Sequence, residues 1–572
     1  MSTSPPAVTD FVPADLDGRT WDALEPWYTR LLERELPDAA ALEQLLLDRS
    51  ELDAAAHEAY ASLYIAMTCH TEDAAARDGY LTFVDEVDPK LRQVSFDLDT
   101  KISECPFAGE LDAERYGVML RGLRTDVDLF REENIPLQTE ETRLGQQYSE
   151  LCGAMTVTFR GEEKTLPQMS PFLEETDRAT REEAWRLVSD RRLADREKLD
   201  AIFEKMLTVR GAIAGNAGLD DYRAYAFKSK HRFDYTPEDC FAFHRAAEEH
   251  CVPVIRELNE QRRQLLGVDT LRPWDLAVDV HGRDPLRPFD GAEELIDRSS
   301  RLFHRLDAGE QGLGGMFDTM RDGTSLDLEA RAGKAPGGYQ QSLDRQRKPF
   351  IFMNAAGTQR DVDTMIHEAG HAFHSMLCAH DPIRDYRHAP IEFAEVASMS
   401  MELLAHPYLD EFYSEDGLDR ARRTHLEGII RFLPWCATID AYQHWLYTNP
   451  GHDLAARTEQ WVALQDRFSP GVDWTGLEHA RAASWHRQLH IFEVPFYYIE
   501  YGIAQLGSLQ LWLQARKDEA AALANYRAAM TLGGSRPLPE LFGAADLTFD
   551  FGPATVGRLI DAVQEELAAL PA

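Results

Sequence analysis

One short segment of the chain combines residue types that can bind a metal ion and use it, namely His367-Glu368-Ala369-Gly370-His371. In a helix, residues four apart lie on one face, so the imidazoles of His367 and His371 can hold one Zn²⁺ between them. The Glu368 carboxylate stands beside the first imidazole, where it can take a proton from the water that such a metal activates. This pattern predicts a hydrolytic zinc centre.

A catalytic zinc site needs a third protein ligand and leaves its fourth position open. His374 lies seven residues beyond His367, about 10 Å along a helix axis. That distance is too long for the same tetrahedron, so we interpret His374 as a flanking group. The segment 391–402 predicts a second helix that carries several acids, and its spacing leaves Glu392 and Glu395 both open as the third ligand.

The surrounding sequence indicates which elements position the motif. Apolar residues cluster on the side of its helix opposite to the two histidines: Val362, Met365, Ile366, Ala369, Phe373, Met376 and Leu377. Asp361 or Asp363 is expected to cap the start of this helix. The run 349–354 is apolar, aromatic and bounded by turn residues, which predicts a short strand just before it. The glycine-rich loop 336–339 is either a simple turn or a place where a substrate backbone approaches the edge of that strand.

The rest of the chain predicts a mostly α fold with little sheet. Helical periodicity runs from Trp21 to about Ile135 and again over 176–265, while 155–166 is typical of a hairpin. The stretch 267–288 is rich in Pro and Asp and is expected to be irregular and exposed. From Asp361 onward the pattern is helical with loops.

These patterns divide the chain into three parts. We expect an extended lead-in over 1–18, a helical amino-terminal domain over 19–195 and a catalytic domain over 196–572. A length of 572 residues allows more than one hydrophobic core.

Composition limits the class of partner. The 98 Asp and Glu residues outnumber the 60 Lys and Arg residues, for a net charge of −38. This charge argues against nucleic acid and against an anionic membrane surface as partners. Seven widely spaced cysteines are typical of reduced thiols, and neither a secretory signal nor a membrane span is visible. We therefore expect a cytoplasmic protein.

Several motifs, in order, resemble those of the thimet oligopeptidase and oligoendopeptidase F group of zinc metallopeptidases, with the bacterial oligoendopeptidase F branch the more similar. The likeness covers roughly residues 110–570, and its motifs are LEETDRATREEAWRL, KAPGGYQ, PFIFMNAAGTQRDVDTMIHEAGHAFHS, IEFAEVASMSMELL and HIFEVPFYYIEYGIA. The resemblance implies that His367, His371 and Glu395 bind the zinc ion and that Glu368 is the catalytic base.

The same resemblance implies roles for further residues. Glu402 matches an acid that orients a histidine ligand. His490, Tyr498 and Tyr501 match the residues that stabilise the reacting carbonyl, with Tyr497 as an alternative position. Without the resemblance, the tyrosines would be interpreted as a buried aromatic stripe.

The family implies a function and an overall shape. We expect one Zn²⁺ per chain and hydrolysis of internal peptide bonds in short peptides. We also expect a two-lobed helical fold with a deep central channel and a small β-sheet beside the metal-binding helix. The oligomeric state stays open. A zinc enzyme acting on other amides or esters and a peptide-binding protein without activity are the rival interpretations.

Overall fold

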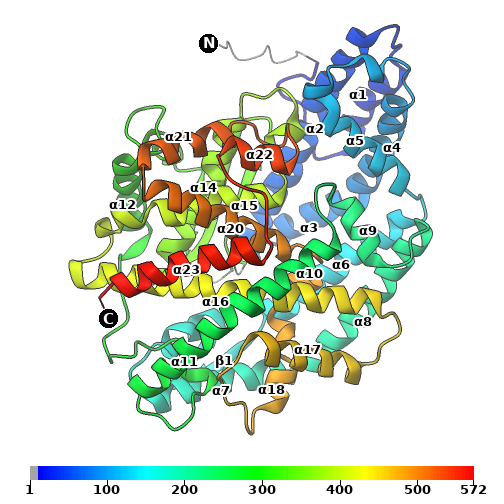
Figure 1. Ribbon diagram of the computed structural model, residues 1–572. Coiled ribbons are helices and arrows are strands. Elements are labelled where there is room, and N and C mark those ends of the chain that lie inside the picture. The colour runs from blue at the N-terminus through cyan, green and yellow to red at the C-terminus, as the bar shows by residue number, and fades with distance from the viewer. Residues whose placement is uncertain (1–10, 332, 336, 572) are drawn as a thin grey trace.

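The computed structural model describes residues 11–331, 333–335 and 337–571 of the chain (Figure 1). Most of the expected lead-in, residues 1–10, and Pro336 of the expected glycine loop lie outside the described residues. The protein is mostly helical with two small sheets, as the sequence predicts. All seven cysteines are free.

The amino-terminal part is a group of helices, as the periodicity predicts. They are α1 (Trp21–Glu33), α2 (Ala39–Cys69), α3 (Ala74–Thr82), α4 (Asp88–Ser103), α5 (Ala113–Leu129) and α6 (Asn134–Gly153). Asp38, Asp73 and Asp112 begin three of them by accepting hydrogen bonds from first-turn amides. Buried apolar side chains of α1, α2, α4 and α5 form one core cluster, which Ile383 and Tyr386 join from far along the chain.

The predicted hairpin is present as β1 (Thr156–Phe159) paired antiparallel with β2 (Glu162–Thr165). Arg160 and Gly161 both have positive φ, 52° and 87°, which is the turn geometry that matches the twist of a two-residue hairpin. The following helices are α7 (Arg178–Ala194), α8 (Arg196–Asn216), α9 (Tyr222–Ser229), α10 (Pro237–Ala246) and α11 (Val252–Leu265).

The stretch 267–288 is irregular, as expected, apart from the short 3-10 helix η5 (Pro273–Asp275), but the expectation that it is exposed holds only in part. Trp274 and Asp275 are buried. The Asp275 carboxylate accepts hydrogen bonds from Arg178 at 2.7 Å and Arg181 at 3.1 Å, both on α7. A buried carboxylate needs such partners, and this ion pair draws the loop onto the helix.

The second sheet has three strands in the order β3 (Leu326–Glu329), β5 (Lys348–Ala355), β4 (Tyr339–Leu343). The predicted strand at 349–354 is therefore confirmed as β5. Its edge is not free for a substrate, because β5 pairs in parallel with β3 and antiparallel with β4. Among the described strands, the unpaired edge beside the glycine loop belongs to β4.

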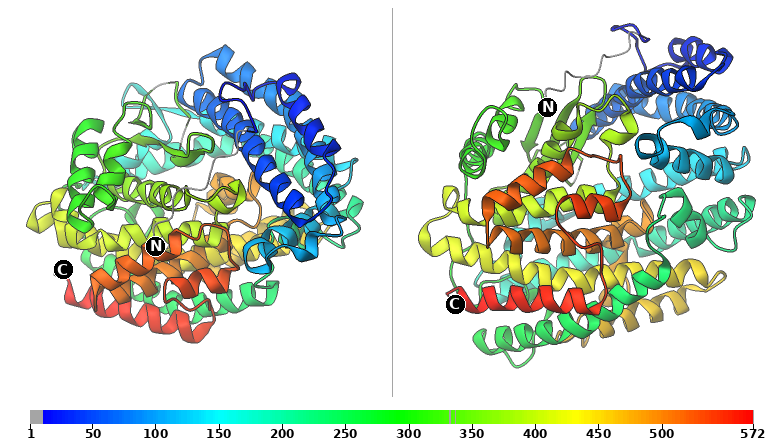
Figure 2. Two further views of the ribbon diagram at one scale, coloured as in Figure 1. Left: turned by 90° about the horizontal axis from the view of Figure 1, so that it is seen from above. Right: turned by 45° about the horizontal axis from the view of Figure 1, so that its top comes forward.

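Helices make up most of the remaining chain. They are α12 (Gly291–Leu306), α13 (Leu313–Thr319), α14 (Gln359–Cys378), α15 (Ile391–Leu404), α16 (Glu415–Thr448), α17 (Leu454–Phe468), α18 (Glu478–Ala482), α19 (Leu489–Phe492), α20 (Tyr498–Ala515), α21 (Glu519–Met530), α22 (Leu538–Ala544) and α23 (Pro553–Ala569). In both views of Figure 2 the blue amino-terminal helices stand on one side of the molecule and the red carboxy-terminal helices on the other. The division near residue 195 and the central channel stay predictions.

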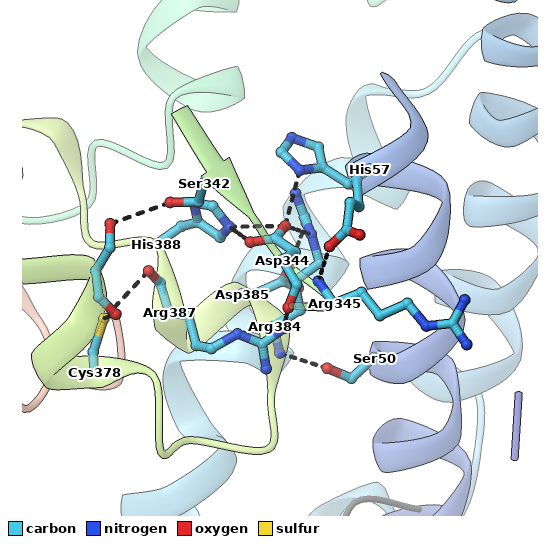
Figure 3. A network of polar contacts seen from close by, with 12 residues as sticks. Ser50, His57, Ser342, Asp344, Arg345, Cys378, Arg384, Asp385, Arg387 and His388 are labelled. Atoms are coloured by element: carbon cyan, nitrogen blue, oxygen red, sulfur yellow. Dashed lines mark hydrogen bonds and ion pairs between the residues drawn. The ribbon is translucent and has the colours of Figure 1, made fainter. Parts of the chain in front are cut away.

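A polar network joins α2 to the turn between β4 and β5. Figure 3 shows His57, Arg384 and His388 converging on Asp344, at 2.8, 2.8 and 2.9 Å from its carboxylate oxygens. Burial alone raises the pKa of Asp344, but hydrogen bonds from the two histidines and the nearby guanidinium hold it well below its usual range. The network links α2 to the turn between β4 and β5. Because the Arg384 guanidinium already balances the charge of the Asp344 carboxylate, the network does not favour binding of a metal cation.

Candidate metal centre

The helix α14 begins with a capping box. The Asp361 carboxylate accepts hydrogen bonds from the amide and the hydroxyl of Thr358, at 2.8 and 2.9 Å. Of the two acids expected to cap this helix, Asp361 does so, from the third helical position. The imidazoles of His367 and His371 then follow on one face, with their ring centroids 4.9 Å apart.

Gly370 sets how closely α15 approaches α14. A Cβ atom built on Gly370 would lie 2.6 Å from the Cα of Ser398 and 2.8 Å from the carbonyl oxygen of Ala397. Both atoms belong to the backbone of α15, so no side-chain rotation relieves the clash. Only a glycine allows this spacing, which brings the acids of α15 to the histidines.

Three side chains converge on one point. The Oε2 atom of Glu395 lies 3.4 Å from Nε2 of His367 and 3.4 Å from Nε2 of His371. The glutamate side chain is 4% exposed, whereas the histidines are 21% and 18% exposed. Two ligand atoms that each lie about 2.1 Å from a tetrahedral metal are about 3.4 Å apart, so this trio fits a zinc ion with one face toward solvent.

The structure distinguishes between the two glutamates that spacing left open. Glu392 is buried and accepts a hydrogen bond from Tyr235 at 2.6 Å, outside the convergent group. His374 is also outside it, buried with its Nε2 atom unpartnered, and burial lowers its pKa to about 3. Geometry therefore favours Glu395 as the third ligand.

A chain of polar residues holds the first histidine in position. The Nδ1 atom of His367 donates to Glu402 at 2.7 Å, the contact that the resemblance implied. The other oxygen of Glu402 lies 2.8 Å from His425, which lies 2.7 Å from His406. Burial alone raises the pKa of Glu402, but hydrogen bonds from His367 and His425 hold it at about 2. Such carboxylates fix the tautomer and orientation of a metal-binding imidazole.

The sequence did not point to His425 or His406. Both lie outside every motif: His406 begins η7 (His406–Glu411) just after α15, and His425 lies on α16, so only the folded arrangement brings these rings to Glu402.

Glu368 is buried beside the convergent group. Burial raises the pKa of its carboxyl, although His367 and His371 lower it in part. A Cβ atom built on Gly338 would lie 3.8 Å from Oε1 of Glu368, so the glycine loop passes directly over the carboxylate. A buried carboxylate with a raised pKa is suited to accept a proton and to give it back.

The segment 497–501 contains three tyrosines, and the hydroxyls of two of them, Tyr497 and Tyr501, lie on the side of the convergent ligand group. Tyr497 donates to Oε1 of Glu395 at 3.2 Å, and the Tyr501 hydroxyl lies 3.5 Å from Nε2 of His490. Tyr498 is turned away, with its hydroxyl against Trp435. Burial raises the pKa of Tyr501, so it stays a hydrogen-bond donor.

His490 is neutral in this environment, because burial lowers its pKa to about 4. Its Nδ1 atom lies 2.7 Å from the amide nitrogen of Gln488. An amide nitrogen donates, so Nδ1 accepts and the ring proton is on Nε2, on the side of Tyr501.

Among the described residues, no helix combines the length and the apolar character needed to span a bilayer.

A mostly helical fold around a His-Glu-x-x-His helix defines a metallopeptidase-like class of protein. The model of "Peptidase family M3" matches residues 172–306 and 310–551, and that of "Peptidase M3 N-terminal domain" matches 13–130. The chain belongs to peptidase family M3.

Relatives and solved structures agree with this assignment. An oligoendopeptidase F homolog of Borreliella burgdorferi is 23% identical over 312 residues, 52% of this chain and 50% of the relative. The alignment thus spans about half the length of that curated relative. The structure of "PZ peptidase A with inhibitor 2" has a TM-score of 0.91 at 28% identity, covering 96% of this chain and 97% of the other. A structure described as an oligoendopeptidase F of Bacillus anthracis has a TM-score of 0.86 at 27% identity, covering 96% of each chain.

Proposed function

We propose that the protein is a zinc-dependent endopeptidase that hydrolyses internal bonds of short peptides. The observation that carries this proposal is the convergence of His367, His371 and Glu395 beside a buried Glu368. Membership of family M3 and the likeness to oligoendopeptidases support the substrate class. The seven free thiols fit a reducing compartment such as the cytoplasm.

His367, His371 and Glu395 would hold the zinc ion, one per chain at this centre. A zinc ion there supplies Lewis-acid chemistry, acidifying water and polarising a carbonyl group. Glu402 and Ser398 orient the ligands through hydrogen bonds of 2.7 and 2.9 Å.

The proton transfers belong to Glu368. Its carboxylate takes the proton of the attacking water and returns it to the departing amine, which needs no covalent intermediate. Burial raises its pKa, which makes the carboxylate a stronger base for the first step while leaving its acid form able to donate in the second.

Tyr501 and Nε2–H of His490 are the donors for the carbonyl oxygen that becomes negative during attack. One donor of this kind contributes about 3–4 kcal/mol to the transition state. The resemblance implied that Tyr498 stabilises the reacting carbonyl. Tyr498 can do so only if its ring turns when substrate binds. Tyr497, which already bonds Glu395, is the better second candidate.

The substrate backbone would add to the sheet at β4. The outer edge of Tyr339–Leu343 is unpaired among the described strands, and the glycine loop beside it leaves room over Glu368.

Glu368→Gln tests the base. The variant should bind zinc like the wild type, because Glu368 is not in the ligand group, and its kcat on a quenched-fluorescent peptide should fall by about 10³-fold. Wild-type turnover in this variant would remove Glu368 from the base role.

Two further measurements test the ligand and the substrate class. Glu395→Ala should lose zinc on dialysis, whereas Glu392→Ala, an equally buried acid one turn earlier, should retain it. The reverse order would move the third ligand to Glu392. A panel of peptides against simple amides and esters tests the main rival, and turnover of the non-peptide compounds alone would refute the peptidase assignment.

A further inference from the structure

Two helices distant from the candidate metal centre in sequence carry a second set of metal-binding residue types. Cys240 and His244 lie four apart on α10, and Asp440 and His444 lie four apart on α16. Residues at this spacing share a helix face. Because α10 packs against α16, the two pairs face each other in the interior of the protein.

The four side chains lie close together and are buried. Ligand atoms of Cys240, Asp440 and His444 are all within 4.8 Å of one another. The Oδ2 atom of Asp440 is 2.7 Å from Nε2 of His244 and 3.3 Å from Nε2 of His444. Both histidine side chains are 5% exposed, and the aspartate is fully buried.

Hydrogen bonding within the protein does not satisfy this group. The bond between His244 and Asp440 accounts for one oxygen. Among the described residues, Oδ1 of Asp440 and Nδ1 of His444 have no hydrogen-bond partner, and Nε2 of His444 has only its 3.3 Å contact with Oδ2 of Asp440, which lacks hydrogen-bond geometry. Buried polar atoms are nearly always paired, so such unpartnered atoms in one cluster indicate a further ligand.

In the described part of the chain, only histidines lie opposite the charge of the Asp440 carboxylate. Burial alone raises the pKa of Asp440, but His444 and His244 hold it well below its usual range, so it is a carboxylate. Burial lowers the pKa of His244, so that ring is neutral at neutral pH. Among the described residues, no lysine or arginine forms an ion pair with Asp440. A buried anion without a permanent cation is costly, and a divalent metal would balance it.

We propose that Cys240, Asp440 and His444 bind a second metal ion of the zinc type, with His244 holding the carboxylate in position. Thiolate, imidazole and carboxylate are all donors that zinc accepts in proteins. The Cys240 thiol loses its proton to solvent when the metal–sulfur bond forms, so binding releases one proton from this residue.

The position of the group indicates a structural role. The ring of His444 lies 5.3 Å from that of Phe496, whose backbone has φ of 64°, unusual for a residue other than glycine. Phe496 directly precedes the tyrosine segment of α20. A metal joining α10 to α16 would therefore stabilise the packing around Phe496, where the tyrosine segment begins.

Sulfur makes the proposal testable independently of the proposed activity, because the candidate metal centre offers only nitrogen and oxygen ligands. In X-ray absorption spectra of the zinc-loaded wild type we expect a sulfur neighbour at about 2.3 Å from zinc. The cobalt-loaded protein should show a thiolate-to-cobalt charge-transfer band in the near ultraviolet. Wild-type protein with neither signal would overturn the proposal, and this result needs no variant to fold.

Variants assign the signal to the residue. Cys240→Ser should lose the band and one metal equivalent per chain, whereas Cys251→Ser, a fully buried cysteine with no ionisable neighbour that shifts its pKa, should keep both. Glu395→Ala should keep the band while losing the metal of the candidate catalytic centre. A band that survives in Cys240→Ser would also refute the assignment.

Discussion

Replacing Gly370 by alanine changes one hydrogen to a methyl group at the closest approach of α14 and α15. The new Cβ would lie 2.6 Å from the Cα of Ser398, whereas ordinary van der Waals contact begins at 3.4 Å. The difference, about 0.8 Å, has to be absorbed by moving one helix, because the opposing atoms are backbone.

The movement acts directly on the ligand set. Glu395 lies three residues before Ser398 on α15, while His367 and His371 flank Gly370 on α14. Metal–ligand distances tolerate only about 0.2 Å, so a shift of 0.8 Å is several times too large. We expect zinc affinity to fall by about 10- to 100-fold, as for lost support of a ligand, which is about 1.4–2.8 kcal/mol.

The assay is competition with a fluorescent zinc chelator, followed by peptide hydrolysis at saturating zinc. Gly370→Ala should show the weaker Kd and also a kcat about 10²-fold lower, because the base and the donors are misplaced even when metal is bound. Gly428→Ala is the matched control, since it lies in the interior of α16 with no atom within 4 Å of the added Cβ. This control should leave both measurements unchanged.

Retention of wild-type Kd and kcat by a folded Gly370→Ala protein would refute the reasoning. It would mean that helix separation does not set the distance between Glu395 and the histidines.

Three other predictions, which use four variants, test separate parts of the structure. Tyr501→Phe should lower kcat about 10²-fold in peptide hydrolysis, while Tyr498→Phe should leave it near the wild-type value, because the Tyr501 hydroxyl lies beside His490 whereas the Tyr498 hydroxyl lies against Trp435. Burial lowers the pKa of His374 to about 3, against about 6.5 in the unfolded chain, so the unfolded state binds more protons between these pH values and the free energy of unfolding falls as pH is lowered from 6.5 toward 3. His374→Phe removes this proton uptake. In urea unfolding, the variant should therefore lose about 1.4 kcal/mol less stability per pH unit in this range than the wild type. Asp344→Asn should lower the unfolding free energy by about 2 kcal/mol at pH 7, because it removes the buried anion of the network and leaves Arg384 paired, among the described residues, only with the exposed Asp385.

The parts of the site that local spacing dictates could be predicted from the sequence. His367 and His371 share a face because they are four apart, and the capping acid and the strand before the helix follow from short-range chemistry. Spacing could not choose Glu395 over Glu392, and only the family resemblance did, because the choice depends on Tyr235, which lies 157 residues away and donates a hydrogen bond to Glu392.

Two other features depend on long-range contacts and therefore could not be predicted from local sequence patterns. Which tyrosine hydroxyl faces the ligands depends on where α20 begins, and a shift of one residue turns a side chain by about 100°. The burial of Trp274 depends on arginines of α7, and a loop rich in Pro and Asp gives no local sign of such partners.

The open edge of β4 has a consequence for how the protein behaves at high concentration. An unpaired strand edge can pair with another copy of itself as readily as with a peptide, and proteins usually protect it with proline, lysine or a bulge. A strand that receives substrate, as we propose for β4, cannot carry such protection, and Tyr339–Leu343 contains neither proline nor lysine. The net charge of −38 then keeps copies apart by mutual repulsion. Resistance of this protein to aggregation therefore depends on repulsion between whole molecular surfaces and not on the sequence of the β4 edge. Salt screens this repulsion and so weakens the protection.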